Sequence, residues 1–379
     1  MLLKSLIFAG AIQGLFLIFL IRAKRKKTYP DFLLIVWLAI VSFQLLFYYD
    51  SLSPIVRAPH FLQLLGYSLP LLSSPILFLY IYSLAFNTET RFRKYAIHIL
   101  PFLVYNIVIF YLFLNNHNSI SVSYGFLHFS EDVPNVIQYF SAMLLAIICG
   151  SYSIFSLFVL IKYQKSLPDN FSYTEKINLN WLKWIVISLL VVFVVVYIVI
   201  RYGVNYGMLN YQNLFAVVGG ILSIYLLLIG YFGLRQTTIF TSYPSSSISK
   251  STHILNKESY KNSGLDNDAA KQILNNLLKY MEKEKPFLDE NLSLSKLSQL
   301  LDITPNQLSQ VINQNTKSNF FNFINNYRVE LVKSKLKNPS YARYTILAIA
   351  FECGFRSKAS FNKIFKQQVG KTPSQYQKD

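Results

Sequence analysis

The fold of the C-terminal region is decided by residues 346–376, which read ILAIAFECGFRSKASFNKIFKQQVGKTPSQY. The spacing of Ile346 and Ile349 predicts a short helix with one apolar face. Gly354 then provides a turn position at which a positive φ is not costly. Ser357 is a suitable N-cap for a second helix. Two short helices joined by a tight turn predict a helix-turn-helix unit.

The second helix of this unit has one apolar face and one basic face. Phe361, Ile364 and Phe365 form the apolar face, and Phe355 fills the core at the turn. The outward residues are Lys358, Ala359, Ser360, Asn362, Lys363 and Lys366. Those near the helix start can reach base edges, where a lysine prefers guanine. The phosphate candidates are Asn362, Lys366 and Lys371. The alternative is a solvated basic face on a plain helical domain, but a cap, a turn and a core in register argue against it.

The same plan occurs once earlier in the chain. Leu294 and Leu297 line the inner face of a helix that opens near Ser293, and its turn runs through Asp302 and Ile303. A longer predicted helix, 320–337, connects the two units.

The second helix of this earlier unit opens with Thr304-Pro305-Asn306-Gln307, a capping box with proline at its first position. Leu308, Val311 and Ile312 are expected to face the core. The residues left outward are Asn306, Gln307, Ser309 and Gln310. Amide side chains at such a helix start can pair bidentately with adenine, which makes Asn306, Gln307 and Gln310 base-reading candidates.

This region resembles the DNA-binding domain of the AraC/XylS family. The resemblance is carried by Ile349-Ala350-Phe351-Glu352-Cys353-Gly354-Phe355-Arg356-Ser357, Phe361, Lys363, Phe365-Lys366, Gly370 and Thr372-Pro373-Ser374-Gln375-Tyr376. The first unit matches too, as do Phe323-Ile324-Asn325 and Arg328. The resemblance covers about Phe287–Lys378. It implies two helix-turn-helix units that read adjacent major-groove segments about one helical turn apart.

The resemblance also implies which positions contact bases. In the first unit these are Asn306 and Gln310, and in the second they are Lys358, Ala359, Ser360 and Lys363. Three residues depart from the family pattern. Asp302 and Lys317 stand where glycine is usual, and Gln377 stands where arginine is frequent, which affects only local geometry. The family's sugar-binding cupin domain has no counterpart in this sequence, so no arabinose-type ligand is implied.

Ahead of this region the sequence contains seven apolar runs of membrane-spanning length. A helix needs about 20 apolar residues to cross a hydrocarbon core of ~30 Å. The runs are Leu2–Ile21, Asp31–Tyr49, Phe61–Phe86, Tyr95–Leu114, Val136–Ile161, Trp181–Ile200 and Tyr211–Gly233. The net charge of +18 suits anionic lipid and nucleic acid alike. The overall plan resembles the seven-span membrane-bound regulators of the same family.

The basic residues of the connecting loops predict an orientation. Those in the loops after the first, third and fifth runs are Arg22, Lys24, Arg25, Lys26, Lys27, Arg91, Arg93, Lys94, Lys162, Lys165 and Lys176. The loops after the other runs hold only Arg57 and Arg201. The positive-inside rule therefore places the N-terminus outside and the C-terminal domain in the cytoplasm. Because its basic cluster follows the first run, that run is predicted to be a retained span rather than a signal peptide.

The membrane region offers few reactive groups. No run carries an acid near its middle, which argues against a proton-coupled pump. Pro70, Pro75 and Pro101 are expected to kink helices, and such kinks either frame a pocket or are ordinary features of membrane helices. The outer loops contain His60, His117, His128, Glu131 and Asp132. These form either a pH or metal sensor or a set of solvated loop residues.

The sequence contains no motif typical of an enzyme. We find no Walker A loop, no dinucleotide fingerprint and no metal-ligand spacing. Cys149 lies in an apolar run and Cys353 in the C-terminal region, so a disulfide between them is not expected. We therefore expect no catalytic residues, no cofactor and no metal.

Together these patterns predict an all-α protein. A seven-helix transmembrane bundle over 1–235 is followed by a flexible polar linker over 236–264. A cytoplasmic DNA-binding domain over 265–379 then contains helix-turn-helix units at about 293–314 and 345–368.

The expected function is that of a one-component transcription regulator in the cytoplasmic (inner) membrane. Its partners would be double-stranded DNA, the lipid bilayer and an unidentified signal ligand. A homodimer would hold two copies on repeated DNA sites. The alternative is a membrane transporter or receptor whose C-terminal domain is a protein-interaction or autoregulatory module. An intramembrane enzyme has almost no support, because no paired acids or Ser/His arrangement lies in the runs.

Overall fold

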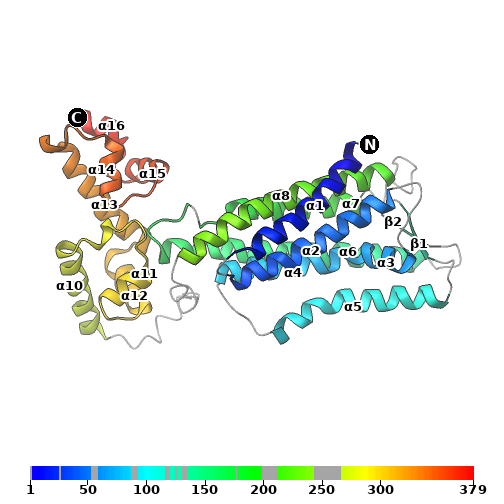
Figure 1. Ribbon diagram of the computed structural model, residues 1–379. Helices are drawn as coiled ribbons and strands as arrows, with labels where there is room; N and C mark the ends of the chain where they lie inside the picture. Colours follow the sequence, from blue (N-terminus) through cyan, green and yellow to red (C-terminus); the bar gives the residue numbers. More distant parts are fainter. Residues whose placement is uncertain are drawn as a thin grey trace. The chain divides into compact units, whose positions relative to one another are not determined.

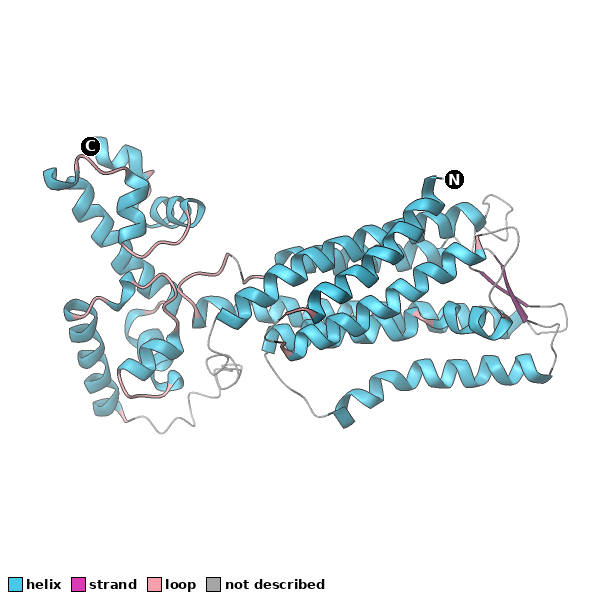
Figure 2. Ribbon diagram, viewed as in Figure 1, coloured by secondary structure: helices cyan, strands magenta, loops and turns pink. Residues whose placement is uncertain are grey.

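The computed structural model describes residues 2–24, 27–52, 59–86, 92–115, 120–123, 126–129, 135–175, 177–198, 211–242 and 266–379. The fold is helical, as predicted, apart from one short hairpin (Figure 2). The chain divides into two compact units. The first comprises Met1–Ile161 and Leu179–Ser242, and the second comprises Lys162–Asn178 and Tyr243–Asp379. The grouping of 162–178 with the C-terminal residues has no counterpart in the domain boundaries expected from the sequence, which stay a prediction.

The first unit is built from long apolar helices. Their bounds are α1 (Leu2–Arg22), α2 (Tyr29–Ser51), α3 (His60–Ser68), α4 (Pro70–Phe86), α5 (Phe92–Asn115), α6 (Asn135–Asn170), α7 (Asn180–Ile198) and α8 (Tyr211–Ser242). Helix α2 packs against α1, α4 and α8, and α1 also packs against α8 (Figure 1). The residues of α6 from Lys162 onward belong to the second unit.

Among the residues that the structure describes, six helical segments are long and apolar enough to cross a membrane by length and composition. They are Leu3–Arg22, Tyr29–Ser51, Phe61–Phe86, Ile97–Leu114, Met143–Asn170 and Ala216–Leu234. Each overlaps one of the predicted spans, although Met143–Asn170 extends beyond the predicted end at Ile161. The remaining predicted span coincides with α7, whose apolar stretch Asn180–Val195 is shorter than the other six.

The prolines affect the helices differently from one another. The predicted third span consists of α3 and α4, which are separated at Leu69, and Pro70 begins the second of them. Pro75 and Pro101 lie inside α4 and α5, which continue through them. The third span is therefore interrupted at Pro70, whereas the kinks expected at Pro75 and Pro101 stay a prediction.

Small residues allow α1 and α8 to approach closely. A Cβ atom added to Gly10 of α1 would fall on the side chain of Ser223, and one added to Gly230 of α8 would fall on Leu17. Such contacts suit helices in lipid, where close backbone packing replaces the hydrophobic effect.

At the start of α2, the buried Asp31 completes a capping box with Thr28 and accepts a 2.9 Å hydrogen bond from Lys24.

A short antiparallel hairpin occupies part of the loop between α5 and α6. Its strands are β1 (Ile120–Ser123) and β2 (Phe126–Phe129), with Ile120 paired to Phe129. The sequence did not predict these strands. The side chains of the sensor hypothesis (His60, His117, His128, Glu131 and Asp132) lie outside what the structure describes, so that hypothesis stays a prediction.

The second unit is an assembly of shorter helices. They are α10 (Asn267–Lys283), η3 (Pro286–Leu288), α11 (Leu294–Leu300), α12 (Pro305–Thr316), α13 (Phe320–Lys337), η4 (Pro339–Tyr341), α14 (Ile346–Glu352), α15 (Lys358–Val369) and α16 (Pro373–Lys378). One apolar core forms around α10 to α12 and another around α14 to α16. Helix α13 contributes to both, and Leu331 packs against both.

Candidate nucleic-acid interface

Helices α11 and α12 form the first helix-turn-helix. Ser293 caps α11 by accepting a hydrogen bond from the Lys296 amide, at 3.2 Å. Asp302 has φ +54° in the turn. The Thr304 hydroxyl caps α12, and the Gln307 side chain bonds back to the Thr304 amide at 3.0 Å. The cap and the turn that the sequence predicted are therefore confirmed.

Helices α14 and α15 form the second helix-turn-helix. Thr345 caps α14, and Ser357 caps α15 by accepting from the Ser360 amide at 3.1 Å. Gly354 has φ +89° in the turn, in the left-handed region that favours glycine. Phe355 is buried against Phe361, with ring centroids 5.1 Å apart. This unit, too, has the geometry that its sequence predicted.

Lys317 also adopts the left-handed conformation, with φ +51°, directly after α12. Asp302 and Lys317 thus stand in backbone conformations where the resembled family usually has glycine. A non-glycine residue in this region costs roughly 1–2 kcal/mol. Asp302 and Lys317 therefore lower the local stability but leave the backbone conformation as expected for glycine.

The base-reading candidates of α12 are not equally accessible. Asn306 is exposed, whereas the amide oxygen of Gln307 is engaged by the capping box. Ser309 and Gln310 are 3% and 6% exposed, so their expected outward orientation was wrong. Helices α10, α11 and α13 all pack against α12 and bury a wider face than the apolar stripe alone indicates. The Gln310 Oε1 atom has no hydrogen-bond partner among the described residues.

Helix α15 presents most of the predicted polar face. The predicted residues that are exposed are Lys358, Ala359, Asn362, Lys363 and Lys366. Ser360 is 6% exposed, so its expected outward orientation was wrong, because it lies in the first turn beneath the Ser357 cap. Lys371 is exposed and forms a 2.8 Å ion pair with Asp379. That ion pair would have to open before Lys371 could bind a phosphate.

Arg328 is a buried residue that the sequence analysis did not single out for a role. Its guanidinium donates to the Phe287 carbonyl and to the Asp289 carbonyl, each at 2.8 Å. It also donates to the Asn325 side chain at 3.3 Å. Burial lowers its pKa to about 10, so it remains a cation at neutral pH. The sequence contains one signal of this burial. Arg328 is four residues from both Ile324 and Val332, a spacing that places it on the inner face of α13.

A second polar contact joins α13 to α14. Lys335 forms a 2.8 Å ion pair with Glu352 and lies 4.7 Å from the ring centre of Tyr341. Burial by itself would lower the pKa of Lys335, but hydrogen bonds to Glu352 and Tyr341 outweigh it and raise the pKa. Helix α13 is thus tied to the second unit by a polar contact as well as by its apolar core.

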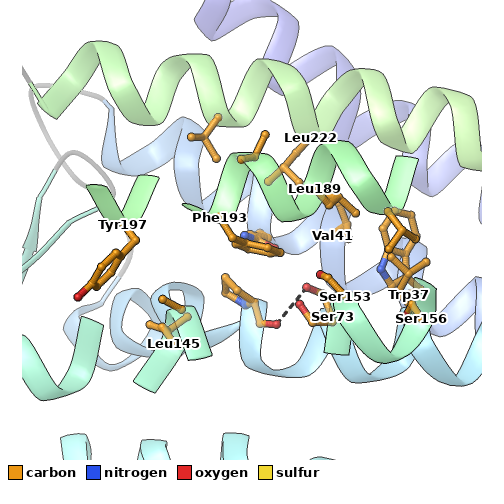
Figure 3. Close-up of a pocket in the computed structure, with 18 of the residues that line it drawn as sticks. Trp37, Val41, Ser73, Leu145, Ser153, Ser156, Leu189, Phe193, Tyr197 and Leu222 are labelled. Carbon is orange, nitrogen blue, oxygen red and sulfur yellow. Dashed lines mark hydrogen bonds between the residues drawn. The ribbon is translucent and has the colours of Figure 1, made fainter. Parts of the chain in front are cut away.

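The first unit contains a cavity of about 130 Å³. Its walls come from α2, α3, α4, α6, α7 and α8, and Figure 3 shows Trp37, Ser73, Ser153 and Phe193 among the residues around it. The described residues that line it are mainly aliphatic and aromatic, and none of them carries a charged side chain. Gln44 and several serines add groups that can form hydrogen bonds. No group of three His, Cys, Asp or Glu residues in the described part of the chain could hold a metal ion.

Comparison with known proteins places the second unit in a class. Residues 297–379 match the family described as "Helix-turn-helix domain", which is of the AraC type. An uncharacterised HTH-type transcriptional regulator of Staphylococcus aureus (strain COL) is 32% identical over 127 residues, which are 34% of this chain and 16% of that protein. The XylDLEGF operon transcriptional activator 2 of Pseudomonas putida is 28% identical over 97 residues, which are 24% of this chain and 62% of that protein.

A solved structure of a protein of unknown function from Listeria innocua is also similar, with 28% identity and a TM-score of 0.25. That match covers 28% of this chain and 95% of the other. The chain spans less than two thirds of the length of these curated relatives. The C-terminal part is therefore an AraC-type helix-turn-helix domain, and the named relatives are transcriptional regulators.

Proposed function

We propose that this protein is a membrane-anchored one-component transcription regulator. The observation that carries the proposal is a complete pair of helix-turn-helix units in a chain with six helices of membrane-spanning length. The units would bind specific double-stranded DNA in the cytoplasm, while the apolar helices would hold the chain in the cytoplasmic membrane. With α7 counted as a seventh span, the basic residues that follow the first, third and fifth spans would fall on the same side as the C-terminal domain, and the positive-inside rule would place that side in the cytoplasm.

DNA reading would rest mainly on α15. Lys358, Ala359 and Lys363 are exposed near its start and middle, where a recognition helix meets base edges. Asn362 and Lys366 would contact phosphates, and Lys371 would join them after releasing Asp379. In α12, the exposed Asn306 is the base-reading residue that the geometry favours.

The cavity in the first unit would receive the signal. Its lining lacks charged side chains, and a charged ligand would lose its hydration there without a partner. The ligand class is therefore uncharged and largely apolar, with one or two groups that bond to Gln44 or to serines such as Ser73 and Ser153. Two copies of the regulator, held side by side in the membrane, would occupy repeated DNA sites with a high effective concentration.

A selection experiment tests the DNA-binding part of this proposal. The full-length protein, reconstituted in lipid nanodiscs, is incubated with random-sequence DNA, and the retained DNA is sequenced. We expect a defined motif to be recovered. Recovery of only sequence-indifferent, salt-sensitive DNA would contradict a regulator. Solute flux in proteoliposomes would then become the measurement of choice, because a transporter with a C-terminal interaction module predicts it.

A further inference from the structure

The segment Phe171–Glu175 lies in the connection between α6 and α7, and within the second unit it packs against the helix-turn-helix domain. Phe171 pairs with Ser293 in an isolated antiparallel bridge. The Ser172 hydroxyl donates to the Leu292 carbonyl at 2.8 Å, and its amide donates to the same oxygen at 3.4 Å. The connection between α6 and α7 is thus hydrogen-bonded to the backbone just before α11, where the first helix-turn-helix unit begins.

Two buried side chains of α13 bind the backbone of this segment. Asn325 and Arg328 donate to the Ser172 carbonyl at 3.2 Å and 3.4 Å. Arg328 also donates to the Ser172 hydroxyl at 3.2 Å. Asn325, Arg328 and Ser172 are 0%, 1% and 2% exposed. Polar groups buried this deeply must be hydrogen-bonded, so the site around Arg328 is complete only when the segment occupies it.

The same segment reaches the start of α15. The Glu175 carboxylate accepts from the Ser357 hydroxyl at 2.6 Å and from the Tyr173 hydroxyl at 3.2 Å. The Tyr173 ring lies 5.5 Å from the Arg356 guanidinium. Burial and the Glu175 charge raise the pKa of Tyr173 to about 12, so its hydroxyl is a neutral donor at physiological pH. Segment residues therefore contact both helix-turn-helix units.

The position of Glu175 is one that DNA would also favour. Ser357 is the N-cap of α15, and the exposed Lys358 follows it directly. The positive end of a helix and its free amides attract anions, and DNA phosphates commonly bind at such ends. A carboxylate held against the cap fills that place with negative charge, and it repels a phosphate that approaches the same end of α15.

We propose that segment 171–175 is an intramolecular ligand of the helix-turn-helix domain that competes with DNA for the start of α15. The inference rests on the proposed function. The segment joins α6 to α7, and both helices contribute walls to the 130 Å³ cavity, through residues such as Ser153 and Phe193. A ligand in the cavity that moves α6 or α7 would move the helix ends between which the segment lies, and would so control its release.

The test measures DNA affinity of the full-length protein in nanodiscs, with the motif recovered by selection as the probe. Glu175→Gln removes the charge from an exposed side chain. We expect it to raise affinity about three- to tenfold, because one charge-assisted hydrogen bond holding the segment is weakened. The matched control is Glu282→Gln, which removes an exposed charge from α10 and should leave affinity unchanged. Equal affinities of the wild type and Glu175→Gln would overturn the competition.

A second measurement follows docking without DNA. Cysteines replace Glu175 and Ser357, and a short thiol-to-thiol crosslinker is added; the native Cys149 and Cys353 are buried. We expect efficient crosslinking, and lower DNA affinity for the crosslinked than for the same uncrosslinked variant. Absent crosslinking, or unchanged affinity after crosslinking, would contradict the proposal. If crosslinking is efficient but no variant binds specific DNA, the proposed function and the competition both fail while the docked segment stands.

Discussion

Gly354, in the turn of the second helix-turn-helix, lies directly against the main-chain oxygen of Phe287. A Cβ atom at this glycine would collide with that oxygen and would lie 3.0 Å from both the Leu288 oxygen and the Arg328 Nε atom. The same Phe287 oxygen accepts a hydrogen bond from Arg328. The turn of one unit therefore packs against the chain that leads into the other, with the buried guanidinium beside both.

We expect Gly354→Ala to destabilise the domain more than Gly370→Ala. Both glycines have positive φ, +89° and +79°, but a Cβ at Gly370 meets nothing within 4 Å. Gly370→Ala, the control, should lower the free energy of unfolding only by the conformational cost of alanine at a positive φ, roughly 1–2 kcal/mol. Gly354→Ala should lower it further, because the collision with the Phe287 oxygen adds to that cost. Urea-dependent labelling of the buried Cys353 measures the stability. Equal losses in the two variants would show that the contact with Phe287 is unimportant.

Replacing Arg328 by methionine should destabilise the domain by about 3–5 kcal/mol, the usual cost of breaking a buried, hydrogen-bonded charge arrangement. The change leaves the carbonyls of Phe287 and Asp289 without their donor. Arg328→Lys should recover little of the lost stability, since one ammonium group cannot reproduce the planar set of donors of the guanidinium. Thermal unfolding of the two variants provides the comparison, and full recovery by lysine would argue against the geometric role.

Stability below neutral pH should depend on Asp289. Burial would raise its pKa, but hydrogen bonds from Lys296 and the Asn291 amide, with the Lys296 charge, lower it below the ordinary value. A lowered folded pKa means that the stabilisation is present above the unfolded pKa and is lost as pH falls through the folded one. We expect Asp289→Asn to flatten the stability profile below about pH 4. An unchanged slope would exclude this carboxylate as its source.

Lys358→Ala and Lys363→Ala should each weaken binding to the selected motif by ~1–3 kcal/mol. Both side chains are exposed on α15. Lys279→Ala, which removes an exposed charge from α10, is the control and should have little effect. Titrations at several salt concentrations separate loss of base reading from loss of general electrostatic attraction. Unchanged affinity in both α15 variants would refute this helix as the reading element.

Filling the cavity should change signalling. Ser153→Phe introduces a large side chain beside the 130 Å³ space, whereas the neighbouring Ile154 is 44% exposed and points away from it. We expect Ser153→Phe to alter the output of a reporter gene driven by the selected motif, and Ile154→Phe to leave it unchanged. Identical output from Ser153→Phe and the wild type would remove the cavity from the signalling scheme.

Local signals in the sequence predicted much of the second unit. The N-caps Thr304, Thr345 and Ser357 bond to backbone amides three residues further on, so short patterns were enough to infer them. The positive φ of Gly354 could likewise be inferred from the residue itself. The predicted connecting helix has the observed bounds of α13. Composition likewise indicated the apolar helices, because membrane-length runs need no tertiary information to be recognised.

Contacts between distant residues were beyond such patterns. Arg328 and Ser172 are 156 positions apart, and nothing near either residue indicates the other. Gln310 and Ser360 have polar side chains on helices with an outward face, yet packing by other elements buries them. The strands β1 and β2 also depend on pairing with each other rather than on any single strongly apolar run.

The single helix α13, whose Leu331 packs against both cores, sets the distance between α12 and α15. A helix that holds α12 and α15 at a fixed distance also fixes the spacing of the two DNA segments that these helices would bind. Under the proposed function, each DNA target would have to present its two recognition boxes at one spacing and on one side of the duplex. Inserting about half a helical turn, some 5 base pairs, between the boxes would turn one of them away from the protein. Under the proposed function, the promoters that this protein controls would therefore tolerate changes of base sequence more readily than changes in the length of the spacer between the boxes.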